Sequence, residues 1–283
     1  MKNTMLMLAS SSAMALAMTA YGYSADFVER FDGAKPAVSG LNGKVDFGYL
    51  FIDIPDLDAS ADGFYGIGSV SAPVGERFGA QIDAGLFEAE DNDGAGIDSA
   101  GIGGHFFWRN PDQALIGAYV HYVNVDAEGI PEFDIYRYGV EAELYLDRVT
   151  LSGFAGADTV DLVSGDETYA KLDFTASYYV TDNVKISAGI DHGFDSTAGV
   201  IGAEAMLPFA SNNVSLYTKA TFTDDTTSVN AGLRIHFGAP GKSLIARHRE
   251  DDPESMLFDF AEGSALPDGV FVPGASTPPI TVD

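Results

Sequence analysis

Charged residues of both signs recur at every second position in several segments of the chain. Residues 136–146 read YRYGVEAELYL, so that Arg137, Glu141 and Glu143 alternate with apolar side chains. In an extended strand alternate residues share one face, which places such charges together. This spacing selects Arg109, Arg137, Glu141, Glu143, Lys171, Asp173, Lys185, Lys219 and Arg234, with Lys44, Asp46, Asp83, Asp191 and Glu204 on equivalent positions. A face of this kind can form internal ion pairs or line a water-filled passage, and both interpretations stay open.

A second cluster of oxygen-bearing residues lies in the segment DNDGAGID, residues 91–98. Acids at the first and third positions and glycine at the sixth match a calcium-binding loop. Ala95 at the fifth position and Ile102 at the twelfth supply no side-chain ligand. We therefore interpret the segment as an acidic loop without a dedicated site, and loose binding of divalent cations is the alternative. The weak calcium candidates are Asp91, Asp93 and Asp98.

Nucleophilic catalysis has little support. A barrel lipase or deacylase needs a serine activated by a correctly oriented histidine, and no G-x-S-x-G segment occurs. The five histidines are scattered, and the spacing points three of them to the polar face: His105, His121 and His236. The chain has no cysteine, which excludes a thiol nucleophile, a disulfide and a cysteine-ligated metal. We predict no enzyme and no cofactor, with the lipase as third choice.

The overall charge narrows the class of partner. Forty-two acidic residues against 15 basic ones give a net charge of −27. A general nucleic-acid binder needs a basic footprint, so that class is excluded. Acidic runs are typical of a solvated surface, and an electrostatic bias toward cations is the functional alternative.

Strands are needed to position the polar faces, and residues 226–238, TTSVNAGLRIHFG, show them most clearly. Val229, Leu233 and Ile235 share one face with other apolar residues, while Arg234 and His236 lie on the other. Similar period-two runs follow one another from residue 44 to residue 238. We count about twelve, each of about 10 residues, which is the length of a tilted strand that spans a bilayer.

The connections between these runs alternate in character. Those at 75–77, 110–112, 147–148, 181–183 and 211–213 are tight, whereas those at 55–62, 88–99 and 126–132 are longer and more acidic. Transmembrane barrels have short periplasmic turns, longer external loops and an even strand number. The sequence therefore predicts an all-β fold, an antiparallel transmembrane barrel with residues 226–238 as its closing strand, paired with 44–54. A soluble β-sandwich or barrel is the alternative.

The two ends of the chain differ from the middle. Residues 1–25 have a basic start, an apolar stretch and small residues, which is typical of a signal peptide. Residues 26–42 are an irregular lead-in, and 43–238 form the barrel. Residues 239–283 begin with a short helix over 242–250 and continue as an acidic, proline-rich tail, which we predict to be disordered. Anchoring of this tail through Phe258 or Phe260 is the alternative.

Two segments resemble a known family. Residues 37–50, AVSGLNGKVDFGYL, resemble the first strand of porin-like outer-membrane β-barrels of Gram-negative, particularly alphaproteobacterial, cells. Residues 228–253 are similar to the closing strand and tail of such proteins. The resemblance covers 44–238 in pattern and these two segments in residues. It implies an outer-membrane location and recognition of a terminal aromatic residue by the assembly machinery. Here Phe237 would serve internally, with a long tail beyond it.

These observations lead to one preferred function and one alternative. Passive diffusion of small hydrophilic solutes or ions is preferred, and a closed structural or surface-interaction barrel is the alternative. Twelve strands lie between the filled interior of eight and the open channel of sixteen, so a narrow passage is expected. Partners would be outer-membrane lipid, lipopolysaccharide and the assembly machinery, with divalent cations at the external loops. Both chain ends would lie in the periplasm.

Overall fold

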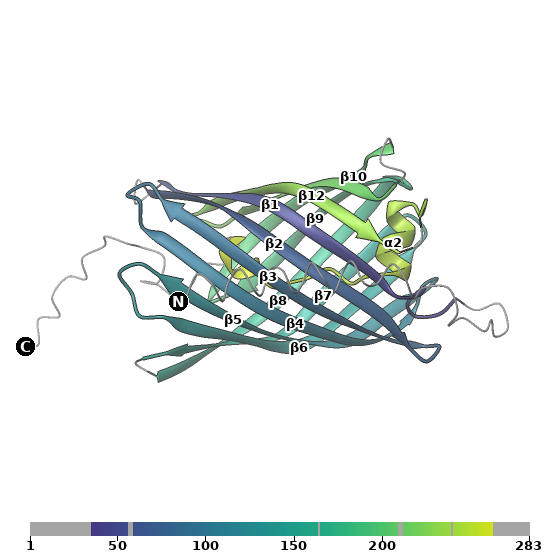
Figure 1. Ribbon diagram of the computed structural model, residues 1–283, viewed down its shortest axis with the longest axis horizontal. Coiled ribbons are helices and arrows are strands. Elements are labelled where there is room, and N and C mark those ends of the chain that lie inside the picture. Colours follow the sequence, from purple (N-terminus) through teal and green to yellow (C-terminus); the bar gives the residue numbers. More distant parts are fainter. Residues whose placement is uncertain (1–34, 56–58, 164, 209–211, 239, 263–283) are drawn as a thin grey trace, which may run out of the picture.

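The structure is a computed structural model that describes residues 35–55, 59–163, 165–208, 212–238 and 240–262. Twelve antiparallel strands form a closed barrel (Figure 1). Each strand pairs with its neighbour in sequence, and β1 (Asn42–Ile54) pairs with β12 (Thr227–Phe237), as predicted. The other strands are β2 (Ala59–Val74), β3 (Phe78–Asp91), β4 (Gly96–Asn110), β5 (Ala114–Ala127), β6 (Phe133–Leu146), β7 (Val149–Leu162), β8 (Gly165–Thr181), β9 (Val184–Gly193), β10 (Ser196–Met206) and β11 (Val214–Phe222).

Two short helices follow the barrel. They are α2 (Leu244–Glu250) and the 3-10 helix η4 (Asp259–Glu262). In the described part of the chain, no helix has both the length and the apolar character to cross a membrane.

Period-two alternation explains which side chains face the lumen, the interior of the barrel. On β12 the side chains of Val229 and Leu233 are exposed, while Asn230, Arg234 and His236 are buried. The same pattern holds on β2, where Phe64 points outward and Ile67 points inward. Every lysine and arginine on the described strands lies on the lumen side. The alternation therefore places the basic residues of the described strands in the interior and divides the acids between the two faces.

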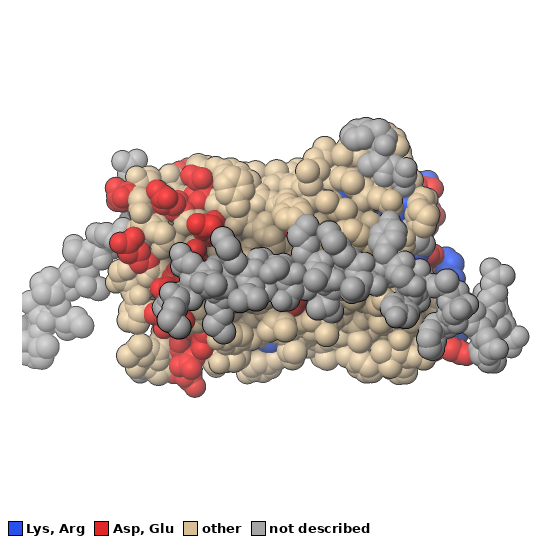
Figure 2. Space-filling view, in the orientation of Figure 1, with Lys and Arg blue, Asp and Glu red and all other residues tan. Residues whose placement is uncertain are grey.

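The outer surface carries an apolar belt. Exposed side chains on it include Phe47, Ile82, Ile116, Val140, Leu172, Ile190 and Leu216. Aromatic residues border the belt, with Phe78, Phe106 and Tyr178 toward one end and Phe51, Phe64, Tyr122 and Tyr136 toward the other. Outward charges on the described strands are all acidic and lie at a single end, which we call the acidic end: Asp53, Asp62, Glu88, Glu90, Asp98, Asp126, Asp134, Asp161 and Asp166. Figure 2 shows acidic side chains gathered there, at the left.

The connections at the acidic end are shorter than the sequence predicted. β2 begins at Ala59, β3 continues to Asp91 and β4 begins at Gly96, so only residues 92–95 join β3 to β4. Near the acidic end the side chains are polar on both faces of the strands, so the sequence shows no period-two alternation there. The backbone pairing of β3 with β4 nevertheless continues through these residues. The prediction of long loops over 55–62 and 88–99 was therefore wrong, whereas the tight turns at 75–77 and 147–148 are confirmed.

The lumen is partly filled at the opposite end, which we call the helix end. Helix α2 packs there, with Leu244 buried against Tyr179 and Met206. The residues before β1 also enter the lumen, where Val38 packs against Phe107. At the acidic end the lumen holds an apolar chamber instead. Its wall is formed by Leu50, Ile52, Ile67, Phe87, Ala89, Ile97, Val123, Val125, Ala127, Phe133, Ile135, Val160 and Phe194.

The chain after α2 corrects the prediction of a disordered tail. Residues 251–262, here called the inner segment, lie inside the barrel (yellow in Figure 1). Leu257, Phe258 and Phe260 are buried in the apolar chamber, so the anchoring alternative describes this part of the tail. The short helix predicted over 242–250 is present as α2. The signal peptide and residues 263–283 fall outside the described residues.

Candidate functional site in the barrel lumen

The charges selected from the sequence all lie on the lumen side, between the helix end and the apolar chamber. Arg109, Arg137, Glu141, Lys171, Lys185 and Arg234 are buried. Glu143, Asp173 and Lys219 are half-buried and line a cavity. Their role in conduction stays a prediction, but their position is that of a candidate site.

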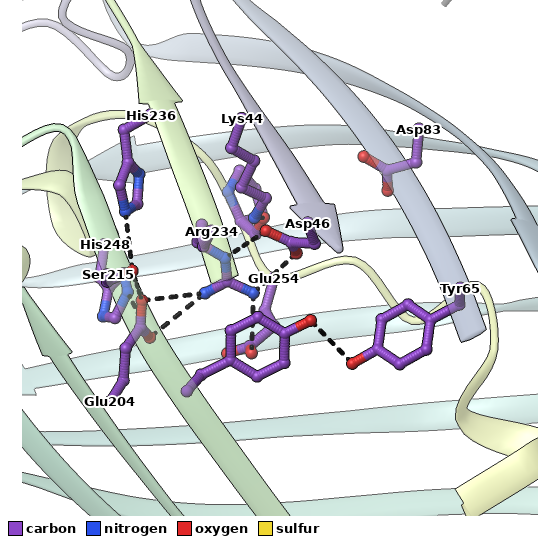
Figure 3. Close-up of polar contacts among 12 residues, drawn as sticks. Lys44, Asp46, Tyr65, Asp83, Glu204, Ser215, Arg234, His236, His248 and Glu254 are labelled. Carbon is purple, nitrogen blue, oxygen red and sulfur yellow. Dashed lines mark hydrogen bonds and ion pairs between the residues drawn. The ribbon is translucent and has the colours of Figure 1, made fainter. Parts of the chain in front are cut away.

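Arg234 on β12 is the centre of one charged network (Figure 3). Its guanidinium donates to both carboxylate oxygens of Asp46, at 2.7 and 2.9 Å, because β1 and β12 place the two residues opposite each other. It also donates to Glu204 Oε2 at 3.2 Å. A bidentate pair with a further carboxylate satisfies a buried cation well. Arg234 is therefore bound to the barrel wall independently of the inner segment.

A second network crosses the middle of the sheet. His105 lies between Asp83, with Nε2 to Oδ2 at 3.0 Å, and Glu141, with Nδ1 to Oε2 at 2.9 Å. Arg137 donates to both oxygens of Asp158, at 2.7 and 2.9 Å. Lys171 pairs with Asp191. These charges form ion pairs along the barrel wall.

The serine-histidine pair that the sequence did not reveal is Ser215 and His236. Ser215 Oγ lies 3.2 Å from His236 Nε2, but it also donates to Glu204 Oε1 at 2.7 Å. An activated serine gives its proton to the histidine, and the acid orients that histidine from its other nitrogen. Here the acid contacts the serine, and Ser215 is fully buried. The contact is thus that of a structural hydrogen bond.

Arg109 is an unusual buried cation near the helix end. Its Nη1 donates to the carbonyl oxygens of Ala37 at 3.3 Å and Asp251 at 3.0 Å, while Nε and Nη2 have no hydrogen-bond partner. The guanidinium stacks over Phe107 at 4.6 Å from the ring centroid. Arg109 therefore joins three separate parts of the chain: β4, the lead-in and the inner segment.

The inner segment is attached to the wall by polar contacts at its start. Lys44 Nζ and Gln81 Nε2 donate to the carbonyl oxygen of Pro253, at 2.5 and 3.1 Å. Ser71 donates to the Asp252 carboxylate. Farther along, the Asp259 carboxylate lies 3.3 Å from Arg137 Nη1. Strands from several sides of the barrel thus hold one short segment across the lumen.

Glycines in the wall make room for the apolar part of this segment. A Cβ atom on Gly85 would lie 2.8 Å from Phe258, and one on Gly101 would lie 3.2 Å from Leu257. Both glycines face the lumen on neighbouring strands, β3 and β4. Since a side chain at either position would collide with the segment, the wall is shaped to accept it.

A cavity of about 220 Å³ remains beside the inner segment. Its charged lining comprises Asp46, Glu141, Glu143, Asp173, Glu204, Glu254 and Asp259 with Lys185, Lys219 and Arg234. Ion pairs and space for water therefore coexist at this level of the lumen.

Two groups of site residues were missed from the sequence. Asp158 continues the inward positions of Phe154 on β7, and extending period two by four residues would have found it. Glu254 and Asp259 belong to the inner segment, which has no strand pattern. The only local sign was the pair of aromatic residues, Phe258 and Phe260, within an acidic stretch.

The calcium candidates are not brought together. Asp91 Oδ1 accepts hydrogen bonds from the backbone nitrogens of Asp93 at 2.9 Å and Ala95 at 2.8 Å, which is the role of a turn-capping carboxylate. Asp98 lies on β4 and points outward. Within the described ranges, no group of three or more histidine or acidic side chains is arranged to hold a metal ion.

Comparisons with known proteins give structural neighbours only. No family model matches the chain, and no curated protein matches it. The KdgM porin in complex with disordered oligogalacturonate is 8% identical, with a TM-score of 0.48 over 69% of this chain and 99% of that one. The translocator domain of the autotransporter NalP from Neisseria meningitidis is 12% identical, with a TM-score of 0.49 over 81% and 98%. An anion-selective porin from Comamonas acidovorans is 11% identical, with a TM-score of 0.38 over 70% and 98%. These TM-scores are all below 0.5. We therefore assign the barrel fold from the strand pairing of this chain, which closes β1 onto β12.

Proposed function

We propose that the protein is a porin-like barrel of the outer membrane that admits small hydrophilic solutes or ions. An apolar belt bordered by aromatic residues is the surface that lipid requires. A closed sheet leaves no unpaired strand edge within the hydrocarbon region. These features support a membrane-spanning barrel.

The observation that carries the proposed passage is the charged cavity in the lumen. Carboxylates and ammonium or guanidinium groups surround about 220 Å³ at the level where the wall is most polar. Water and small ions can occupy such a space, whereas a tightly packed core would leave none.

Conduction is tested with the purified full-length protein in planar lipid bilayers. We expect discrete, small openings, because the inner segment narrows the lumen. Liposome swelling with sugars of increasing size would give the size limit. Failure of both the full-length protein and a form ending at Glu250 to conduct would exclude the proposed passage.

A closed structural barrel is the second candidate. The observation that favours it is the apolar chamber, which Leu257 and Phe258 fill from within. In that case the acidic end would serve as a surface for lipopolysaccharide-bound cations, and the same bilayer measurement separates the two functions.

The proposed orientation places the acidic end outside the cell and both chain ends in the periplasm. The exposed Asn92 lies at the acidic end, and the exposed Asp112 lies at the helix end. In this cysteine-free chain, Asn92→Cys should react with a membrane-impermeant thiol reagent on intact cells. Asp112→Cys should react only after permeabilisation, and the reverse result would invert the orientation.

A further inference from the structure

The lining of the lumen cavity has an unequal charge balance. Seven carboxylates and three cationic side chains border it among the described residues. Two of the carboxylates, Glu254 and Asp259, belong to the inner segment and not to the barrel wall. The segment therefore makes an already acidic lining more acidic.

Glu254 contributes a negative charge that the wall does not require. Its side chain is 65% exposed and lies 3.6 Å from Arg234 and 3.7 Å from Lys185. Both cations have partners on the wall, since Glu204 lies 3.2 Å from Arg234 and 3.4 Å from Lys185. The Glu254 carboxylate thus faces the cavity as a charge available to a passing ion.

The next residues of the segment limit size. Leu257 and Phe258 fill the apolar chamber directly beyond the charged cavity, against the wall glycines Gly85 and Gly101. In a barrel that conducts, the Glu254 carboxylate and these side chains would therefore lie one after the other along the lumen.

We propose that the inner segment is the specificity-determining element of the lumen, which makes the passage cation-selective through Glu254 and narrow through Leu257 and Phe258. This inference depends on the proposed function, because selectivity exists only if the barrel conducts. The permeant class is small cations, since a surplus of fixed negative charge raises the local concentration of positive ions.

The charge component is tested by the reversal potential of the full-length protein in a KCl gradient. Wild type should favour K⁺ over Cl⁻, and Glu254→Gln should lower the permeability ratio by about twofold or more, because one fixed charge leaves the lining. Glu250→Gln is the matched control. It removes the same charge from α2, where Glu250 contacts Lys35 and Lys242 outside the cavity lining, and it should leave the ratio unchanged.

The size component is tested by widening the chamber. The double variant Leu257→Ala/Phe258→Ala keeps the polar attachments of the segment and should raise single-channel conductance severalfold. A form ending at Glu250 should conduct more and select less, while a form ending at Glu262 should behave as wild type.

The outcomes distinguish this inference from the proposed function. One outcome would overturn the inference and leave conduction intact. It is that channel openings have the same selectivity and conductance in wild type, Glu254→Gln, the double variant and the form ending at Glu250. Silence of every form would overturn conduction and the inference with it. A silent wild type with an open double variant would overturn cation selection by the native segment and favour the closed barrel.

Discussion

At the scale of single residues, the buried charges of the lumen differ from the exposed ones in how many partners they have. Arg234 has two carboxylate partners on the wall and is buried together with them. Arg148 pairs with Asp182 where both side chains are largely exposed, at 41% and 63%. Solvent weakens the second pair, whereas removing one member of a buried pair leaves an uncompensated charge.

Arg234→Met should therefore destabilise the barrel by about 3–5 kcal/mol, because Asp46 would remain buried without its cation and Glu204 would keep Lys185 but lose Arg234. Arg148→Met, the matched control, should cost only about 0–1 kcal/mol. Urea unfolding in detergent, followed by the loss of heat-modifiable gel mobility, measures both. Equal midpoints for the two variants would contradict the assigned importance of the Arg234 network.

His248 on α2 is expected to give the helix end a pH dependence. Burial, together with nearby Lys185, lowers the pKa of His248 below its usual value of 6.5, against the opposing effect of Glu204 and Glu254. Its Nδ1 lies 2.8 Å from the Tyr179 hydroxyl, which suits a neutral ring. Below pH 6.5 the unfolded imidazole takes up a proton that the folded one resists, so folding loses free energy as the pH falls.

The melting temperature of wild type should accordingly fall more steeply between pH 7.5 and pH 5 than that of His248→Gln. Other groups titrate in both proteins, so the difference between the two isolates His248. A difference that stays constant over this range would show that His248 does not titrate differently on folding.

At the scale of elements, the inner segment combines polar attachment with apolar burial. Its start is bound through backbone and carboxylate oxygens, and its end is packed in the chamber. Because the barrel strands pair with one another and not with this segment, the segment can leave without breaking the sheet. Local opening is therefore a separate event from unfolding.

This separation is measurable with a thiol in the chamber. Leu257→Cys should react slowly with a maleimide, and adding Phe258→Ser should raise the rate by more than about tenfold, since loss of a buried phenylalanine costs about 3–5 kcal/mol. Val163→Cys, at an 84% exposed position, is the control that reacts in both backgrounds. Equal rates at 257 and 163 in the otherwise native chain would mean that the segment is not held inside.

At the scale of the whole molecule, the apolar belt and the acidic end define how the barrel sits in lipid. Leu233 and Thr227 both point outward on β12, but Leu233 lies within the belt and Thr227 lies at its acidic border. The cost of a charge on the lipid face depends on depth.

Leu233→Arg should block assembly, because arginine near the bilayer midplane costs about 2–4 kcal/mol, whereas Thr227→Arg should cost about 0–1 kcal/mol. Heat-modifiable mobility of the membrane fraction distinguishes the assembled from the unassembled protein. Normal assembly of Leu233→Arg would refute the assigned facing of the strand.

Strand number, facing and closure followed from the sequence, because period two is a local property that each run displays independently. The outward position of Leu233 and the inward position of Arg234 needed nothing beyond their own strand. The inward side was also foreseeable for all nine of the selected charges, from Arg109 to Arg234.

The ion-pair partners of the lumen charges and the position of residues 251–262 depended on contacts between distant parts of the chain. Arg137 pairs with Asp158 because of the register between β6 and β7, which the facing of either strand does not specify. The inner segment has no periodicity of its own, and its place follows from a chamber whose wall residues come from seven strands, β1 to β7, and from the turn between β9 and β10. Acidic composition suggested disorder, but burial of Leu257, Phe258 and Phe260 inside a closed wall overcomes it. Such burial exists only once the barrel has formed.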